Sequence, residues 1–376
     1  MKKTLTEILR SSIESESIDK LSVDQILSFF LNDKTQKLYP TGIQSQLDPR
    51  TGEPVLFNAA RASRPHDYPA QGGDNFPLDN CPICSGHTTG ILDWVDLSDG
   101  FTFINKNMYP VLDISDIFIA SDPKQREQKN KNSVWGLHFV QWSSTDHDRD
   151  WHNMPLGDCI TVMSRLAVLE KALTAVGAEL TQKAGSDPLL QDNQWSISII
   201  KNVGSAVGGS LEHGHQQIVL GNLIPKRIQN DQNFLLDHGQ AFTDFLLSQN
   251  ADELTIRDYG PAVLLVPFFM RRPFDMILAM KDSQKSFLYD LDREELEAVA
   301  AGWKDGAQIF HQIMPSLNRE VAYNIITHNG PGVGLYFEFL PFTQEIGGLE
   351  HLGLTVCQAD PYQTADRIRE YLENTD

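Results

Sequence analysis

The chain has 376 residues, enough for two domains of ordinary size or for one large domain. Its 50 acidic and 31 basic side chains give a formal net charge of −19 at pH 7, which argues against a nucleic-acid partner because polyanions are bound by clustered Lys and Arg. No run approaches the roughly 20 apolar residues of a membrane span, and the charged N-terminus MKKTLTEILRSSIESES lacks the apolar stretch of a signal peptide, so we expect a cytoplasmic protein with no membrane partner.

The first predicted elements are one or two short amphipathic helices in residues 1–40, where apolar residues recur at helical spacing. We interpret residues 1–45 as an N-terminal helical extension. Residues 46–86 are rich in Pro, Gly and Asn, which predicts a strand followed by a long ordered loop. Loops of that length are often functional.

From about residue 100 onward, a pattern of elements occurs twice. The first copy contains the strand LHFVQWS, a helix at about 157–184, the strand WSISIIKN, a glycine loop and the strand HGHQQIVL. The second contains FDMILAM, a helix at about 292–315, VAYNIITHN, the loop GPGVG and LYFEFLP. The repeat predicts an α+β fold, a duplicated antiparallel sheet with helices packed on it, divided into residues 46–225 and 226–376.

The polar strand of the first copy carries His213, His215 and Gln217 at alternate positions, so all three side chains share one face. An isolated H-x-H pair is more often packing than chemistry, but here the glycine-rich KNVGSAVGGS precedes it, and successive glycines let backbone N–H groups enclose a phosphate. A neutral imidazole is a competent nucleophile at pH 7. Attack on the α-phosphorus of a nucleotide would form a phosphoramidate, with the Gln217 amide donating to the phosphoryl oxygens.

Cys81 and Cys84 form a C-x-x-C pair in NCPICSG, and four cysteines in all are too few for a secreted disulfide framework. Such a pair holds zinc or does redox chemistry. Prolines and glycines surround it instead of a strand and a helix, which favours zinc. Histidines would supply the other ligands, and the available ones are His138, His147, His152 and His213. We assign Trp135, Trp142 and Trp151 to the core.

Several motifs between about residues 45 and 373 resemble, in order, those of the galactose-1-phosphate uridylyltransferase family of the histidine-triad superfamily, which includes related nucleotide-sugar and dinucleoside polyphosphate phosphorylases. They are DPRTGEPVLFNAARASRP, CPIC, NMYP, GLHFVQWSSTDH and KNVGSAVGGSLEHGHQQ. The resemblance implies a histidine-triad-like sheet in both halves and a homodimer in which each chain completes its neighbour's sugar site.

The resemblance also implies a role for individual residues. His215 would be the nucleophile that carries the nucleotide, and Gln217 the amide that contacts the transferred phosphoryl group. The implied zinc ligands are Cys81, Cys84, His147 and His213; the implied nucleotide and phosphate contacts are Arg61, Arg64, Asn107, Asn202 and Ser210; the implied sugar or acceptor contacts are Glu350 and Gln358.

Three departures from the family pattern stand out. Gly214 replaces the proline of the family's H-P-H, which we expect to loosen the backbone that presents the nucleophile. Gly334 and Tyr336 replace the H-x-H of the family's other metal site, so we expect no second metal. The sugar-recognition region departs at His351 and around it.

The resemblance predicts a nucleotidyltransferase that moves a nucleoside monophosphate between a nucleoside-diphosphate sugar and a phosphate acceptor through a nucleotidyl-histidine. Two alternatives stay open. One is a phosphorylase of an ADP- or GDP-sugar or of a dinucleoside polyphosphate, and the other is a catalytically decayed nucleotide-binding protein.

Overall fold

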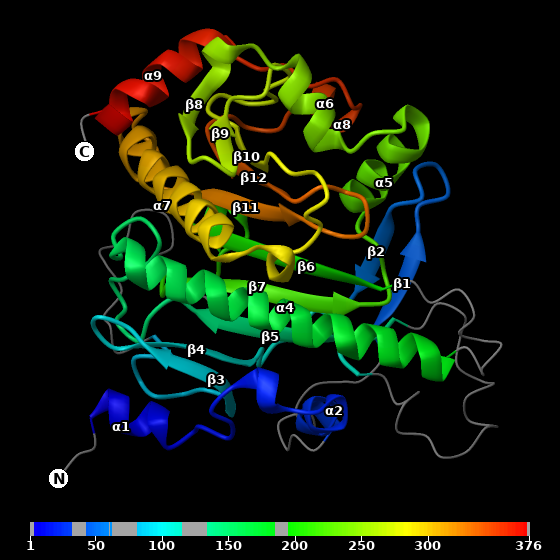
Figure 1. Cartoon of the computed structure of the whole chain (residues 1–376), viewed down its shortest axis with the longest axis vertical. Coiled ribbons are helices and arrows are strands. Elements are labelled where there is room, and N and C mark those ends of the chain that lie inside the picture. The colour runs from blue at the N-terminus through cyan, green and yellow to red at the C-terminus, as the bar shows by residue number, and fades with distance from the viewer. Residues whose placement is uncertain are drawn as a thin grey trace.

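The computed structural model describes residues 4–31, 43–59, 61, 81–114, 134–184 and 195–373. Ten strands form one antiparallel sheet in the order β3-β4-β5-β7-β6-β11-β12-β10-β9-β8 (Figure 1). The strands of the first half are β3 (Ile91–Asp96), β4 (Phe101–Lys106), β5 (Gly136–Trp142), β6 (Ser196–Val203) and β7 (His215–Gly221). Those of the second half are β8 (Thr255–Asp258), β9 (Ala262–Leu265), β10 (Met276–Met280), β11 (Tyr323–His328) and β12 (Tyr336–Pro341).

The order of the strands has the symmetry of a duplication. β6 and β11 pair at the centre, and on either side follow β7 and β12, then β5 and β10, then β4 and β9, and finally β3 and β8. The predicted α+β class, with a duplicated antiparallel sheet, is confirmed. The predicted domain boundaries at residues 45 and 225 stay a prediction, because one continuous sheet joins the two halves through the β6–β11 pair.

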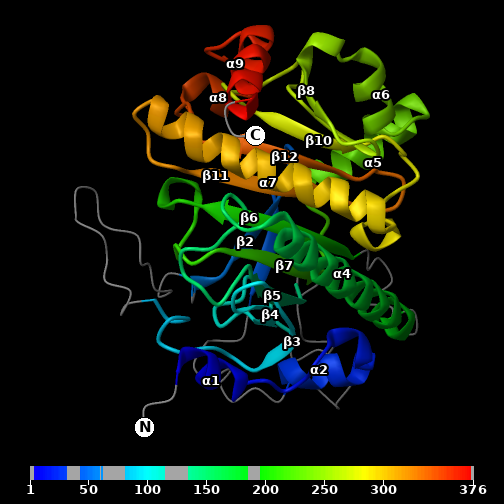
Figure 2. The ribbon, with the colours of Figure 1, turned by 60° about the vertical axis from the view of Figure 1, so that its left-hand side comes forward.

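Two long helices cover one face of this sheet. α4 (Leu156–Ala184) lies over the first half and α7 (Arg293–Ser316) over the second, side by side in both views (Figures 1 and 2). α7 begins at a capping box, in which the Asp292 carboxylate accepts from the Glu295 N–H. The core between helices and sheet is mostly aliphatic, with the fully buried rings of Trp151 and Trp303 5.0 Å apart within it. Both helices match their predicted ranges to within a residue or two.

The N-terminal helices α1 (Leu5–Arg10) and α2 (Val23–Leu31) pack onto the first half. Leu9 and Phe30 are buried, and the Phe30 ring lies 4.9 Å from that of Phe139 on β5. At the start of the predicted strand-and-loop segment, the structure has a hairpin of two strands, β1 (Gln44–Leu47) and β2 (Pro54–Phe57). Its turn closes where Gly52, at φ 70°, donates to the Asp48 carbonyl, a conformation that favours glycine. Most of the predicted loop, residues 62–80, lies outside the described residues.

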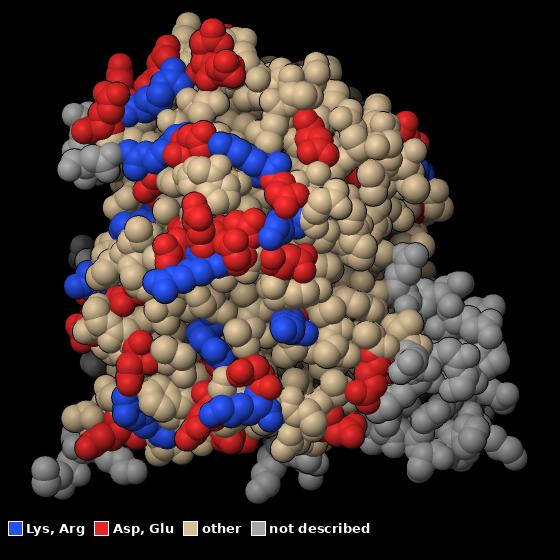
Figure 3. Space-filling view, viewed as in Figure 1, with Lys and Arg blue, Asp and Glu red and all other residues tan. Residues whose placement is uncertain are grey.

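The remaining helices surround the second half of the sheet: α5 (Lys226–His238), α6 (Phe242–Gln249), α8 (Gly348–His351) and α9 (Pro361–Glu373). Across the described part of the chain, no helix has the combined length and hydropathy of a membrane span. On the face shown in Figure 3, acidic and basic side chains are interspersed, so that face has no extended basic patch.

Candidate active site and metal centre

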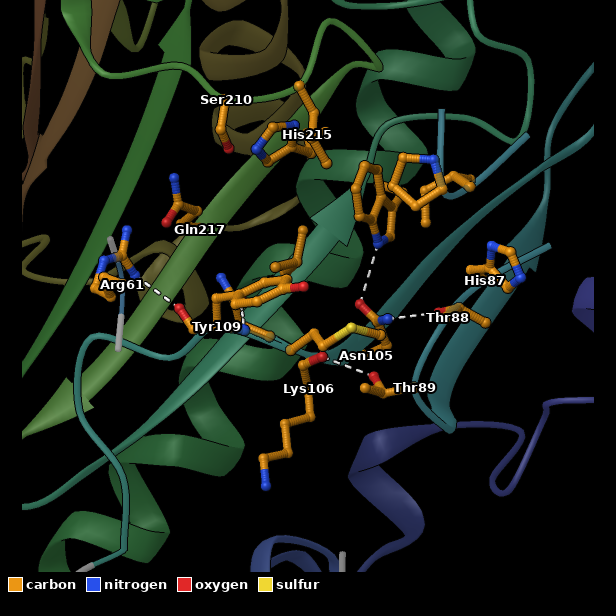
Figure 4. Close-up of a pocket in the computed structure, with 17 residues that line it drawn as sticks. Arg61, His87, Thr88, Thr89, Asn105, Lys106, Tyr109, Ser210, His215 and Gln217 are labelled. Atoms are coloured by element: carbon orange, nitrogen blue, oxygen red, sulfur yellow. Dashed lines mark hydrogen bonds between the residues drawn. The ribbon is translucent and has the colours of Figure 1, made fainter. Parts of the chain in front are cut away.

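The alternation of side chains along β7 separates a reactive face from a packing face. His215 and Gln217 line a pocket of about 430 Å³ and are 7% and 8% exposed (Figure 4). Gln216, between them, donates to Gln141 at 2.8 Å, and Gln141 in turn donates to the Val162 carbonyl of α4. The pocket therefore opens on the face of the sheet away from α4.

A hydrogen bond of His215 determines which of its ring nitrogens carries the proton and which carries the lone pair. Its Nδ1 lies 2.8 Å from the carbonyl oxygen of His213. Because a carbonyl only accepts, Nδ1 carries the proton and donates it, and Nε2 of the neutral ring carries the lone pair. Nε2 is thus the ring nitrogen that could act as a nucleophile, which is the property a phosphoryl-accepting histidine requires.

Four residues form a cluster that could hold one metal ion. The ligand atoms of Cys81, Cys84, His147 and His213 all lie within 4.8 Å of one another. Nδ1 of His213 is 3.6 and 3.7 Å from the two sulfurs, and Nδ1 of His147 is 3.4 Å from that of Cys84. Tetrahedral zinc with ordinary bond lengths separates a sulfur from a nitrogen ligand by about 3.6 Å.

The second nitrogen of His213 orients the ring toward this cluster. Its Nε2 lies 2.8 Å from the Ser144 carbonyl and donates to it, so Nδ1 presents its lone pair to the sulfurs. Burial, followed by the nearby Cys81, raises the pKa of the Cys84 thiol to about 12 in the absence of a cation. Such a thiol is a poor redox group at neutral pH, and a bound cation would deprotonate it. The residues present therefore fit a structural metal.

The other two candidate histidines lie elsewhere. His138 accepts from the Val111 N–H through Nδ1, and its Nε2 lies 3.1 Å from Nδ2 of Asn107. Burial, with Arg61 nearby, lowers the pKa of His138 to about 3, so this ring is neutral. The ring of His152 stacks on that of His311 at 3.6 Å.

Several predicted nucleotide contacts meet at the pocket. Nη1 of Arg61 donates to the Tyr109 carbonyl at 2.7 Å, and the Tyr109 N–H donates to Asn107 at 2.8 Å (Figure 4). These contacts join the end of the β2 segment to the NMYP turn after β4. The structure thus brings together five predicted residues: Arg61, Asn107, Ser210, His215 and Gln217.

Three described residues that were predicted as contacts do not line this pocket: Asn202, Glu350 and Gln358. Arg64 lies outside the described residues. Asn202 on β6 accepts from Nδ2 of Asn324 at 2.7 Å. Glu350 accepts from the N–H groups of Gly347 and Val356, and Gln358 is exposed in the same C-terminal segment. Their roles stay predictions.

One wall of the pocket, around Trp142, was not predicted from the sequence. Trp142 is 5% exposed, as expected of a core residue, yet it also lines the pocket, with its ring 5.0 Å from that of His215. Its Nε1 donates to Asn105 at 3.1 Å, and Asn105 donates to Thr88 at 2.6 Å. Only the pairing of β4 with β5 places these side chains together. No short motif in residues 88–105 marked Asn105 or Thr88 as pocket residues.

In the second half, Tyr336, one of the two residues that replace the family's H-x-H, belongs to a hydrogen-bonded cluster. His328 at the end of β11 lies between two carboxylates, with Nδ1 2.6 Å from Asp231 and Nε2 3.0 Å from Glu338. The Tyr336 hydroxyl donates to Asp231 at 2.8 Å. Both nitrogens of His328 are thus engaged by carboxylates, and the absence of a second metal stays a prediction.

A histidine whose lone pair faces a pocket that also holds an arginine is suited to accept and return a phosphoryl group, so fold and site define a nucleotidyl-transferring enzyme. No protein-family model matches the chain. ADP-glucose phosphorylase of Arabidopsis thaliana is 23% identical over 337 residues, covering 84% of this chain and 88% of that protein. Galactose-1-phosphate uridylyltransferase of Thermotoga maritima is 25% identical over 267 residues, covering 69% of this chain and 72% of that protein.

The fold has solved counterparts as well. A uridylyltransferase structure matches with a TM-score of 0.61 and 21% identity, covering 88% of this chain and 99% of the other. The predicted resemblance to the galactose-1-phosphate uridylyltransferase family is confirmed, as is the predicted class, an enzyme of the nucleotidyltransferase type.

Proposed function

We propose that this protein transfers a nucleoside monophosphate from a nucleoside-diphosphate sugar to a phosphate acceptor in two displacements at His215. In the first, Nε2 attacks the α-phosphorus, the N–P bond forms, and the P–O bond to the sugar 1-phosphate breaks. In the second, a phosphate oxygen of the acceptor attacks the same phosphorus and the N–P bond breaks. The orientation of His215, whose Nδ1 donates to the His213 carbonyl and whose ring lines the pocket, is the observation that carries the proposal.

Other pocket residues would act on the charge of the phosphates. The amide N–H of Gln217 would donate to a non-bridging oxygen as negative charge is redistributed in the transition state. Arg61, which the Tyr109 carbonyl holds at the pocket, would balance the charge of the diphosphate. The His213 carbonyl would stabilise the positive charge that the His215 ring acquires when Nε2 bonds to phosphorus. Arg64 and Asn202 stay proposed nucleotide contacts.

We propose zinc as the metal of the cluster, held by Cys81, Cys84, His147 and His213. Four protein ligands would close its coordination shell, which is typical of structural zinc. Bound there, zinc would supply no step of the reaction but would fix His213, whose carbonyl orients the nucleophile.

The acceptor separates two versions of this activity. A sugar 1-phosphate as acceptor would make the protein a transferase, as the name of the Thermotoga relative states for that protein. Inorganic phosphate would make it a phosphorylase, and the relative with the longer match is an ADP-glucose phosphorylase. Both acceptors, and both adenine and uracil donors, therefore belong in the test.

A second copy of this chain is the partner that the surface favours. The C-terminal segment that carries Glu350 and Gln358 exposes Leu352 at 84% and Leu354 at 61%. The hairpin of β1 and β2 exposes Leu47 at 61% and Phe57 at 56%. Apolar side chains gathered on projecting segments are typical of an interface. We propose a homodimer in which Glu350 and Gln358 reach the neighbouring acceptor site. A cytoplasmic location stays a prediction.

The test is intact-protein mass spectrometry after the metal-loaded protein is mixed separately with ADP-, UDP-, GDP- and CDP-sugars and no acceptor. A nucleoside monophosphate adduct that acid removes would support the mechanism and identify the base. Adding inorganic phosphate or a sugar 1-phosphate should then discharge the adduct and reveal the acceptor. No adduct with any of the donors would overturn the proposal in favour of a binding protein.

A further inference from the structure

A buried ion pair lies beneath the nucleophile strand and has no part in the chemistry described above. Nζ of Lys201 on β6 is 2.7 Å from Oδ2 and 2.9 Å from Oδ1 of Asp150, which precedes α4. The side chains are only 1% and 13% exposed. Removing two charges from water is costly, and a hydrophobic pair of similar size is often at least as stable. Stability alone is therefore a weak reason for this pair.

The pair is connected to the backbone on both sides of the peptide that carries His215. Nζ of Lys201 donates to the His215 carbonyl at 3.2 Å. Ser143 donates from its hydroxyl to Asp150 at 2.8 Å and from its N–H to the Gly214 carbonyl at 2.9 Å. Three successive carbonyl oxygens, of residues 213, 214 and 215, thus each accept a hydrogen bond, the first of them from the nucleophile's own ring.

Gly214 is the residue that makes room for this pair. A Cβ at this position would lie 2.6 Å from Cγ and 2.8 Å from Oδ1 of Asp150, too close for any real contact. Gly214 is not among the glycines with positive φ, so its backbone conformation is open to other residues. Our expectation that Gly214 loosens the backbone is therefore not what the geometry supports: the glycine admits Asp150, and its carbonyl is held by Ser143.

We propose that Asp150 and Lys201 are positioning residues that hold the His215 peptide in register for attack, and that Gly214 is present to accommodate them. The inference rests on the proposed function of His215. Lys201 fixes the carbonyl of the nucleophile residue, Asp150 holds Lys201 and Ser143, and Ser143 fixes the preceding carbonyl. Neither charged group contacts the substrate, so both act through the backbone.

The packing part of the proposal is tested without any substrate. Gly214→Ala should lower the melting temperature of the metal-loaded protein, because its Cβ meets Asp150. In the background Asp150→Gly/Lys201→Met, where the space is open and no lone charge remains, the same substitution should lower it little or not at all. An equal effect in both backgrounds would overturn the assignment of Gly214.

The positioning part is tested by the rate of adduct formation in a single turnover at saturating donor. Lys201→Met/Asp150→Asn removes both charges and the donor to the His215 carbonyl, and we expect adduct formation to slow roughly 10- to 100-fold, the range that a small misplacement of a reacting group costs. The donor dissociation constant should stay unchanged, because the pair lies outside the pocket lining. The single variant Lys201→Arg, which keeps the charge and the donor, should retain much of the wild-type rate of adduct formation.

The matched control is Lys281→Met/Asp258→Asn, which neutralises an exposed ion pair of 2.8 Å that is distant in sequence from His215. This variant should form the adduct at the wild-type rate. A wild-type rate in the Lys201→Met/Asp150→Asn variant would overturn the positioning role while leaving the proposed function intact. A wild type that forms no adduct would overturn the proposed function and, with it, this inference.

Discussion

At the scale of single residues, two histidines two positions apart present opposite nitrogens to their surroundings. Nε2 of His213 donates to the Ser144 carbonyl, so Nδ1 faces the metal cluster, whereas Nδ1 of His215 donates to the His213 carbonyl, so Nε2 faces the pocket. One carbonyl oxygen in each case selects the tautomer. The same residue type is therefore oriented for the proposed metal at position 213 and for the proposed nucleophilic attack at position 215.

Replacing His215 by Asn should abolish the nucleotidyl adduct and reduce turnover by roughly 10³-fold or more, because no other group supplies the nucleophile. Nucleotide binding should persist, since Arg61 and the apolar lining residues Val140 and Trp142 remain. Turnover assays beside a nucleotide-binding titration measure both. His238→Asn, an exposed histidine at the end of α5, is the matched control and should behave as wild type. Undiminished turnover in His215→Asn would show that another residue is the nucleophile.

Gln217→Met keeps the length of the side chain and removes its N–H donor. We expect the rate of adduct formation to fall about 10²-fold, the usual cost of losing one donor to a developing oxyanion, with little change in donor affinity. Single-turnover experiments over a range of donor concentrations separate the rate of adduct formation from the donor affinity. A fall in affinity with an unchanged rate would instead assign Gln217 to ground-state binding.

At the scale of elements, the turn that carries Cys81 and Cys84 is held to the strand that carries the nucleophile. The Cys81 carbonyl accepts from the N–H of Ser85, which forms the turn, and His213 joins it to the segment before β7. The turn of Cys81 and Cys84, the segment after β5 and the segment before β7 thus meet at four ligand atoms. Local sequence identified the thiols, whereas the pairing of β5 with β7 brought in the two histidines.

Cys81→Ala should release the metal and lower the melting temperature, because a structural site loses one of its four ligands. Elemental analysis of the purified protein measures the metal and differential scanning calorimetry the stability. We expect one zinc per wild-type chain, as the proposed site implies. Cys357→Ala, distant from the cluster, should keep the full metal content. A metal-free wild type that forms the adduct would refute the structural role of zinc.

The cluster between α5, β11 and β12 should make stability depend on pH. Burial alone raises the pKa of a carboxyl group, but His328 and Arg227 outweigh it and hold the pKa of Glu338 at about 2. Burial lowers the pKa of an imidazole, but the bonds to Asp231 and Glu338 outweigh it and raise the pKa of His328. A lowered carboxyl pKa stabilises above its usual value, and a raised histidine pKa stabilises below its own.

Wild type should therefore exceed Glu338→Gln in stability most between pH 4.5 and 6.5, the usual pKa values of the two groups. The difference, roughly 3 kcal/mol for the shift of Glu338, should shrink as pH falls toward 2 and as pH rises through the raised pKa of His328. Urea unfolding from pH 5 to 9 measures how the stability difference decreases as His328 loses its proton. Glu297→Gln, in an exposed pair with Arg293, should show almost no difference at any pH. A difference that does not vary with pH would contradict the linkage.

At the scale of the whole molecule, the two halves of the duplicated sheet carry different side chains at corresponding strands. The first half carries the possible metal cluster and the proposed nucleophile on β7, and the second carries the His328 cluster on β11 and β12. The C-terminal segment with Glu350 and Gln358 belongs to the second half and does not line the pocket of its own chain. A neighbouring copy is the means by which these residues would meet a substrate.

Leu352→Asp should convert the proposed dimer into a monomer, because it places a charge among the exposed apolar side chains of the C-terminal segment. Sedimentation velocity measures the assembly. Adduct formation, which needs only His215 and its pocket, should persist, whereas discharge to the acceptor should slow. Leu236→Asp on α5, 81% exposed and outside this segment, should stay dimeric. A monomeric wild type would refute the proposed assembly.

The sequence by itself determined the two-copy order of elements, both long helices, the polar strand and the C-x-x-C turn, because each depends on periodicity or spacing within a short segment. Tertiary structure decided the rest. It joined the halves through β6 and β11, chose His147 and His213 over His138 and His152, and placed Asn105 and Trp142 in the pocket. It also explained Gly214, whose neighbour Asp150 is 64 positions away in the chain. These outcomes depend on which strands pair, and pairing between distant segments leaves no mark on the local pattern of either one.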